Sequence, residues 1–449
     1  MAAKNINSLQ SIPTFRYLFI PILIEQLFIL LLQNMDIVML SQYSDGSVAA
    51  VGLANQIIIV TTMIYGIINV GTTIQLTQLS STSNYKSSSK VVSHSIYLNL
   101  FFTLTLTLSI VIFGDNLLEL IQTPEHLVQE AQTYLIIIAL GFVCHSIIGL
   151  FSSIFKSYAM VRLIMTVNVI INIMNIILNY LVLFTGFDLL GSGVFGVAVA
   201  TNVSRAIGAV ILISYFIKHK NQLVKQLYFN EIDWPVFRNT LYLGIPSAGE
   251  TISYNLSQLV ITGFIASLGA VMVNAKIYSQ LITSVVFQIS MAISQSAQII
   301  IGKMIGRDLK VDAYNFSLKI LIRSTIFNFL VTLLIALLSF YIVPFLTDNP
   351  EIIKYTITLV FLSVLWEPAR NINILLISSL NVSGDVKFPV TVSILVMWIF
   401  VVPMSYIVGI WFGYGLIGIW IVNIVEEWLR ALILFIRWKN GRWRNIHII

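Results

Sequence analysis

The chain has 449 residues, of which 57% are hydrophobic and only 10% are charged, and its mean hydropathy is +0.91. Soluble domains carry about 25% charged residues, so this composition excludes a soluble globular protein and indicates one that crosses the membrane several times. The formal net charge of +6 does not indicate a nucleic-acid partner, because no nucleic-acid-binding motif accompanies it. The single cysteine, Cys144, excludes a disulfide within the chain.

A helix needs about 20 mostly apolar residues to cross the hydrocarbon core of a bilayer. Clusters of polar residues, Gly and Pro divide the chain into twelve such segments. In chain order we predict spans at 16–41, 49–79, 91–113, 127–156, 161–186, 192–217, 238–267, 271–303, 314–345, 351–381, 387–411 and 415–438. No small-residue cleavage site follows a short apolar core near the N-terminus, so we expect the first span to be retained. The predicted fold class is therefore an all-α integral membrane protein with twelve transmembrane helices.

The Lys and Arg residues are distributed unevenly over the predicted loops. Most lie at the N-terminus, on alternate loops and at the C-terminal end, which includes Arg430 and Arg437, whereas the opposite loops carry only Lys276 and Lys354. Because cytoplasmic loops are enriched in Lys and Arg, we predict a multi-pass protein of the plasma membrane with both termini in the cytoplasm. The basic charge then faces the cytoplasm and anionic lipid head groups.

The polar stretch 218–237 divides the spans into two sets of six, which align with one another. PILIE at 21–25 matches PSAGE at 246–250, and GSGVFGVAVA at 191–200 matches GYGLIGIWIV at 413–422. Both copies begin on the cytoplasmic side, so the repeat is parallel, with its axis along the membrane normal. We predict two pseudo-symmetric six-helix lobes around a central cavity: an N-terminal lobe at 1–217, a cytoplasmic linker at 218–237 and a C-terminal lobe at 238–449.

Three stretches carry a recognisable pattern: MDIVMLSQYSDGSVAAVGLANQI at 35–57, QSAQIIIGKMIGRDLKVDA at 295–313 and SLNVSGDVKFP at 379–389. They resemble the multidrug and toxic compound extrusion (MATE) family, within the multidrug/oligosaccharidyl-lipid/polysaccharide exporter superfamily. Together with the length, the twelve spans and the repeat, the resemblance covers essentially the whole chain. It implies a secondary active exporter, not an enzyme, which works by alternating access and needs no cofactor beyond H⁺ or Na⁺ as the coupling ion.

Ionisable residues inside the predicted spans are functional candidates, because a charge within the membrane is costly. The acidic ones are Glu25, Asp36, Glu250, Glu367, Glu426 and Glu427, and the basic ones are Arg205 and Arg370. The excess of acids can carry protons, hold Na⁺ with further oxygen ligands, or attract lipophilic cations. His145, in the middle of a span, is interpreted as a satisfied histidine of the bundle and not as a proton relay.

Span five carries four asparagines on one helical stripe: Asn168, Asn172, Asn175 and Asn179. Amide side chains lack partners in lipid, so we expect this stripe to face the protein interior. One interpretation is a ladder of hydrogen bonds between helices, which we favour for Asn168 and Asn172.

For Asn175 and Asn179 the resemblance implies an ion-coupling site. In archaeal and related MATE proteins, an Asp of span one, an Asn–x–x–x–Asp pair of span five and a Thr of span six hold a cation. Here Asp36, Asn175 and Thr201 match this pattern, while Asn179 replaces the second Asp. Loss of that carboxylate weakens a Na⁺ site at these four residues and favours a single proton on Asp36. Arg205, one turn after Thr201, can pair with Asp36 or with Glu25, and a structural ion pair is an equal alternative.

The C-terminal lobe departs further from the family pattern. In another MATE branch, one acid of span seven and one acid of span ten couple the ion. Here Glu250 lies about one turn before the position of the span-seven acid, and Arg370 lies near the position of the span-ten acid. Glu367 and Arg370 are three residues apart and can pair on one helical face. Arg370 can form an ion pair with Glu367 or with Glu250. A purely structural role for that ion pair and a role in ion coupling are equally good interpretations. Candidate substrate contacts are Tyr254, Tyr278, Gln288 and Met291.

We therefore predict an antiporter that exports organic, mainly cationic, drugs or toxic compounds in exchange for H⁺, or less favourably Na⁺. The expected partners are small amphipathic cations and the lipid bilayer, with the protein as a monomer. A flippase of lipid-linked saccharide is the alternative, but it would need a cationic cavity for pyrophosphate. An intramembrane enzyme is disfavoured because no nucleophile–base or metal set converges in the sequence.

The orientation can be checked with reporter fusions. Green fluorescent protein fused to the C-terminus should fluoresce, and alkaline phosphatase fused after Thr123, in the third predicted loop, should be active, because the first reporter requires the cytoplasm and the second the outside. Inactive phosphatase after Thr123, together with active phosphatase at the C-terminus, would contradict the predicted orientation.

Overall fold

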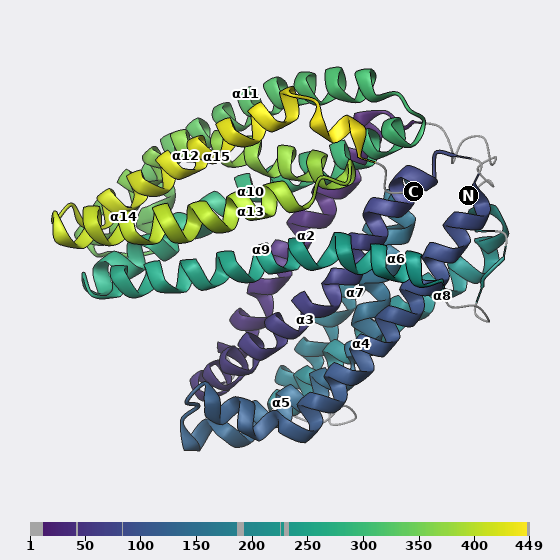
Figure 1. The fold of residues 1–449 in the computed structure, drawn as a ribbon. Helices are drawn as coiled ribbons and strands as arrows, with labels where there is room; N and C mark the ends of the chain where they lie inside the picture. The colour runs from purple at the N-terminus through teal and green to yellow at the C-terminus, as the bar shows by residue number, and fades with distance from the viewer. Residues whose placement is uncertain are drawn as a thin grey trace. The chain divides into compact units, whose positions relative to one another are not determined.

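A computed structural model describes residues 12–41, 44–82, 84–185, 193–224, 226–228 and 233–446, without the side chains of 32–38 and 45. Within these ranges every regular element is a helix (Figure 1). The α-helices are α2 (Phe15–Ser41), α3 (Asp45–Leu79), α4 (Tyr85–Leu120), α5 (Glu125–Leu140), α6 (Phe142–Ser157), α7 (Val161–Phe184), α8 (Gly193–Leu223), α9 (Trp234–Ala266), α10 (Ala270–Gly306), α11 (Lys310–Ile342), α12 (Pro350–Val382), α13 (Lys387–Leu395), α14 (Val402–Tyr406) and α15 (Gly415–Lys439). Short 3₁₀ or π segments are η2 (Val343–Phe345), η3 (Val396–Val401), η4 (Ile407–Trp411) and η5 (Arg442–Asn445).

These helices coincide with the predicted spans. In the described part of the chain, eight segments are long and apolar enough to cross a membrane, and α5 with α6 adds a ninth as a pair bent by 48°. The first, seventh and twelfth predicted spans correspond to α2, α9 and α15, with 27, 33 and 25 residues. The eleventh is one run from α13 to η4 that is partly π-helical, a feature that its uniform hydrophobicity does not reveal.

The sequence repeat reappears in the backbone. Gly193 begins α8 with φ 58° and Gly415 begins α15 with φ 59°, and the two residues correspond in the alignment of GSGVFG with GYGLIG. Positive φ values of this kind favour glycine, which has no Cβ. The last helix of each half therefore starts from the same local backbone geometry.

The described residues form two compact units. Unit 1 comprises Leu27–Ala248, and unit 2 comprises Ile12–Gln26 together with the chain from Gly249 onward. This division differs from the predicted lobes in two helices: the start of α2 belongs to unit 2, and the start of α9 belongs to unit 1. The predicted linker also begins later than expected, because α8 continues to Leu223.

Close approach of two backbones explains why the start of α9 belongs to unit 1. A Cβ on Gly71 of α3 would overlap the carbonyl oxygen of Thr240, and a Cβ on Gly244 would overlap that of Ile67. Small residues allow membrane helices to pack this closely. Gln75 of α3 adds a hydrogen bond of 2.8 Å from Nε2 to Oγ1 of Thr240. The sequence pattern of apolar runs contains no signal for this crossing.

The segment before α9 is bound to α4. The Lys90 ammonium lies 2.7 Å from the Asp233 carboxylate, and the backbone N–H of Asp233 donates to Nε2 of His94 at 2.7 Å. The hydrogen bond from Lys90 lowers the pKa of the Asp233 carboxyl. Ser93 accepts from the backbone N–H of Tyr228 at 2.9 Å. The described part of the predicted linker is therefore docked on unit 1.

The helix crossing at Gly71 can be tested by adding one methyl group. Gly71→Ala should destabilise the protein by about 1–3 kcal/mol, because the methyl group overlaps a backbone atom and the helices must move apart. The matched control is Gly66→Ala on the same helix, where a Cβ meets nothing within 4 Å. Thermal unfolding in detergent should show a lower midpoint for Gly71→Ala only. Equal midpoints for the two variants would contradict the packing described.

Candidate functional site

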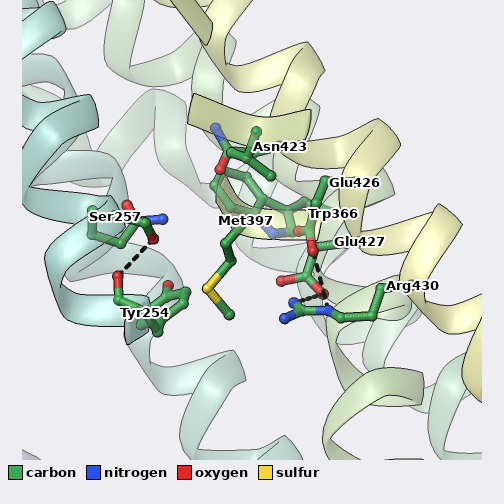
Figure 2. A pocket seen from close by; sticks show the side chains of 10 residues that line it. Tyr254, Ser257, Trp366, Met397, Asn423, Glu426, Glu427 and Arg430 are labelled. Atoms are coloured by element: carbon green, nitrogen blue, oxygen red, sulfur yellow. Dashed lines mark hydrogen bonds and ion pairs between the residues drawn. The ribbon is translucent and has the colours of Figure 1, made fainter. Parts of the chain in front are cut away.

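A small pocket lies inside unit 2, among α9, α12, η3 and α15 (Figure 2). Its cavity of about 10 Å³ has room for roughly one water molecule. The uncharged part of its wall includes Tyr254, Ser257, Gln258, Trp366, Met397 and Asn423. The charged part consists of Glu426, Glu427 and Arg430 on α15. The site is therefore a polar pocket within the membrane-spanning helices of unit 2.

Glu427 is the carboxylate of this pocket that has firm partners. Its Oε2 lies 2.9 Å from Nη2 of Arg430 and accepts a hydrogen bond of 2.5 Å from Nδ2 of Asn373 on α12. The same amide nitrogen donates to the backbone carbonyl of Glu427 at 2.8 Å. Glu427 and Asn373 are 4% and 1% exposed. Charge-assisted hydrogen bonds of this kind fix both the charge and the orientation of a carboxylate.

Glu426 has weaker interactions with its neighbours than Glu427 has. Its Oε1 lies 3.1 Å from Nε of Arg430, so the two form an ion pair by distance. The geometry does not give a hydrogen bond, and both atoms are buried without a hydrogen-bond partner. Nε1 of Trp366, which also lines the pocket, is buried without a partner as well. An incompletely satisfied acid therefore adjoins unsatisfied N–H donors at a cavity.

A second ion pair lies on α12. Nη1 of Arg370 is 3.4 Å from Oε1 of Glu367, so the predicted pairing at three residues' separation is present, and Oε2 of Glu367 is buried without a hydrogen-bond partner. The Arg370 guanidinium also lies 4.3 Å from the centroid of the Phe287 ring. Glu427 interacts electrostatically with both residues of this pair. The pairs on α12 and α15 thus form one network.

Carboxylates outnumber guanidinium groups in this network. Glu367, Glu426 and Glu427 interact with Arg370 and Arg430, and Glu250 of α9 interacts electrostatically with Glu427 and Arg430. When every group is ionised, two negative charges have no positive counterpart among these six residues. Such an excess favours uptake of a proton or another cation.

The structure changes the predicted place of Arg430. From its position in the sequence this residue is predicted to belong to the basic cytoplasmic end of the last span, but it is only 6% exposed and lies inside the network. The spacing in EEWLR, with Glu426 and Glu427 four and three residues before the arginine, was a signal for such pairs on one helical face. Asn373 and Trp366 had no comparable signal.

In unit 1, three of the predicted site residues lie together. Asn175 donates from Nδ2 to Oγ1 of Thr201 at 3.0 Å, and Asn179 donates from Nδ2 to Oδ1 of Asn175 at 3.3 Å. All three are buried, with Asn179 fully so. The Asp36 side chain lies outside the described residues, although its backbone belongs to α2.

The other predicted residues are dispersed. Arg205 interacts electrostatically with Tyr65 and His145, whose Oη and Nδ1 are hydrogen-bonded at 2.6 Å. This bond gives His145 the partner that its interpretation as a satisfied residue requires. Glu25 is buried in the part of α2 that belongs to unit 2.

Of the four candidate substrate contacts, Tyr254 lines the pocket. The other three, Tyr278, Gln288 and Met291, lie on α10, are partly exposed, and are not in its wall. Among the described residues no group of three or more His, Cys, Asp and Glu side chains could hold a metal ion.

Comparisons with known proteins agree on one family. The family model described as MatE matches residues 21–181 and 246–407. The chain is 35% identical to the "Uncharacterized transporter YisQ" of Bacillus subtilis (strain 168), covering 94% of this chain and 93% of that protein. It is 25% identical to the "Probable multidrug resistance protein NorM" of Thermotoga maritima, covering 98% of this chain and 96% of that protein.

The fold is also similar to solved structures. A structure described as the outward-facing conformation of a multidrug resistance MATE family transporter of the MOP superfamily matches with a TM-score of 0.88. The match covers 98% of each chain at 18% identity, so it bears on the fold alone. Structures of this kind have twelve transmembrane helices in two lobes, and the predicted fold class is confirmed.

The dependence of the network on its shared cation can be tested by substitution. Arg430→Met should destabilise the protein by about 3–5 kcal/mol, because it leaves two buried carboxylates without their partner. Arg370→Met should cost less, because that arginine is more exposed and its single ion pair is longer. Thermal unfolding midpoints in detergent measure both. A midpoint for Arg430→Met at or above that of Arg370→Met would show that Arg430 is not the central cation.

Proposed function

This chain belongs to the MatE family of membrane transporters, and from that premise we propose that it exports small organic cations in exchange for protons by alternating access. The members of this family are transporters and not enzymes. The relatives named NorM are described as probable multidrug resistance proteins. A promiscuous exporter of amphipathic compounds is therefore the most direct proposal for this chain.

The observation that carries the proposal is the excess of buried carboxylates in unit 2. Four acids face two arginines in and beside the pocket. In a region of low dielectric, this excess attracts either an organic cation or a proton. An acidic network whose excess charge is compensated either by a proton within it or by an organic cation bound beside it, but not by both at once, is the simplest basis for exchange. Coupling also requires that the two ligands differ in affinity between inward-open and outward-open states.

In unit 1 the proposed ion-coupling residues are Asp36, Asn175, Asn179 and Thr201. The amide and hydroxyl groups of the last three are joined by hydrogen bonds, which supports a common site. They are uncharged, so Asp36 would supply the only carboxylate of this set. A proton needs one basic oxygen, whereas Na⁺ is best held by several oxygens including charged ones, and we therefore favour H⁺ over Na⁺.

In unit 2, Glu250 is a further proposed ion-coupling residue. The supporting charge network in the proposal comprises Glu367 and Arg370 in unit 2, with Glu25 and Arg205 as further members. Export would proceed from the cytoplasm across the plasma membrane, with the protein acting as a monomer. A lipid-linked saccharide flippase is not favoured, because a pyrophosphate group would be repelled by an acidic pocket.

Transport by the purified protein in proteoliposomes tests the proposal. An imposed pH gradient should drive ethidium export, a Na⁺ gradient alone should not, and Asp36→Asn should reduce pH-driven export at least tenfold, because it removes the proposed proton-binding carboxylate. The matched control is Glu130→Gln, an exposed acid of α5, which should export like the wild type. Ethidium movement that neither gradient accelerates would contradict the proposed antiport, and normal export by Asp36→Asn would remove Asp36 from the mechanism.

A further inference from the structure

We propose that Glu426 is the group in unit 2 that binds and releases a coupling proton, and that the adjoining cavity holds one water molecule bonded to its carboxyl group. The inference rests on the proposed proton-driven export. It assigns different roles to two neighbouring acids, Glu426 and Glu427, which the sequence presents as an equivalent pair.

The first step is the difference in partners between the two carboxylates. Glu427 has Arg430 at 2.9 Å and Asn373 at 2.5 Å, so its negative charge is compensated on the same oxygen by two donors. Glu426 is 5% exposed, and its Oε1 has an ion-pair contact but no hydrogen bond. A buried carboxylate with weaker partners gains more from taking up a proton. Of these two acids, Glu426 is therefore the exchangeable one, while Glu427 stays with Arg430 as a fixed anion.

The second step is the chemistry of the cavity wall. Nε1 of Trp366 and Nε of Arg430 are buried N–H donors without acceptors, and both residues line the pocket with Glu426 (Figure 2). A metal cation cannot accept a hydrogen bond and would be repelled by the guanidinium. A water molecule can accept from the two donors while it donates to the carboxylate of Glu426. The cavity of about 10 Å³ has room for one such molecule, and the donor set therefore selects a proton with its water over Na⁺.

The third step is the surrounding charge. Glu426 interacts electrostatically with Glu427 and Arg430 on its own helix and with Arg370 on α12. Glu367 of α12 and Glu250 of α9 belong to the same set through their interactions with Glu427 and the two arginines. The packed segment 393–411 contains no charged residue. Even with Glu426 neutral, this set keeps one negative charge in excess. Protonation therefore halves the excess negative charge of the set, which weakens its attraction for an organic cation.

The assignment can be tested without any substrate. Infrared difference spectra of the full-length protein in lipid, recorded between low and high pH, should contain a carbonyl-stretch band of a buried carboxylic acid that remains in Asp36→Asn, the variant that lacks the proposed proton-binding acid of unit 1. Glu426→Gln should lose this band, while the matched variant Glu427→Gln should keep it, although it unfolds at a lower temperature because Arg430 loses its best partner. If the band that remains in Asp36→Asn also persists in Glu426→Gln, or disappears only in Glu427→Gln, the assignment is overturned. A band suppressed in the wild type by added Na⁺ would overturn the selection of a proton.

Transport distinguishes this inference from the function on which it rests. In proteoliposomes, wild-type ethidium export should accelerate with the imposed pH gradient, and Glu426→Gln should flatten that dependence at least fivefold, while Glu130→Gln should leave it unchanged. If Glu426→Gln loses the infrared band but keeps pH-driven export, Glu426 is a proton site without a role in coupling, and the proposal fails. If the wild type shows the band and no pH-driven export, the proposed antiport fails while the proton site at Glu426 stands.

Discussion

A charged side chain within a membrane-spanning bundle has little water to solvate it, and it persists only where neighbouring groups take the place of that water. Unit 2 meets this requirement with two arginines shared among several carboxylates, and with an asparagine that bonds both the side chain and the backbone of Glu427. The compensation is incomplete at Glu426, Glu367 and Trp366, where buried polar atoms remain without hydrogen-bond partners. Such incomplete satisfaction is costly for stability, and it is typical of a site that exchanges a ligand.

The two halves of the repeat stabilise their buried polar groups with different chemistry. In unit 1 the described cluster at Asn175, Asn179 and Thr201 consists of neutral amides and a hydroxyl, which are joined by hydrogen bonds. In unit 2 the pocket contains ion pairs. The last helix of each half nevertheless begins from the same glycine geometry, at Gly193 and Gly415. The repeat therefore preserves backbone geometry, while side-chain substitutions have given each half its own electrostatics.

Helix packing also shows where the repeat and the compact units diverge. The start of α9 packs on α3 through Gly71 and Gly244, whose missing Cβ atoms allow backbone carbonyl groups to approach. Such contacts depend on which face of each helix meets its neighbour, and the hydropathy of the two spans does not contain this information. One continuous helix, α9, consequently contributes to both compact units.

The sequence alone determined the helical membrane fold, the family and the positions of the spans, because long apolar runs, charged loops and the internal repeat are local or periodic signals. The resemblance to the family also placed Asn175, Asn179 and Thr201 together, and helical spacing paired Glu367 with Arg370. The sequence did not reveal that Arg430 is buried, that Asn373 holds Glu427, or that Trp366 presents an unpaired N–H beside Glu426. Those facts depend on contacts between helices far apart in the chain, and only the tertiary structure decides which polar groups become partners and which remain unsatisfied.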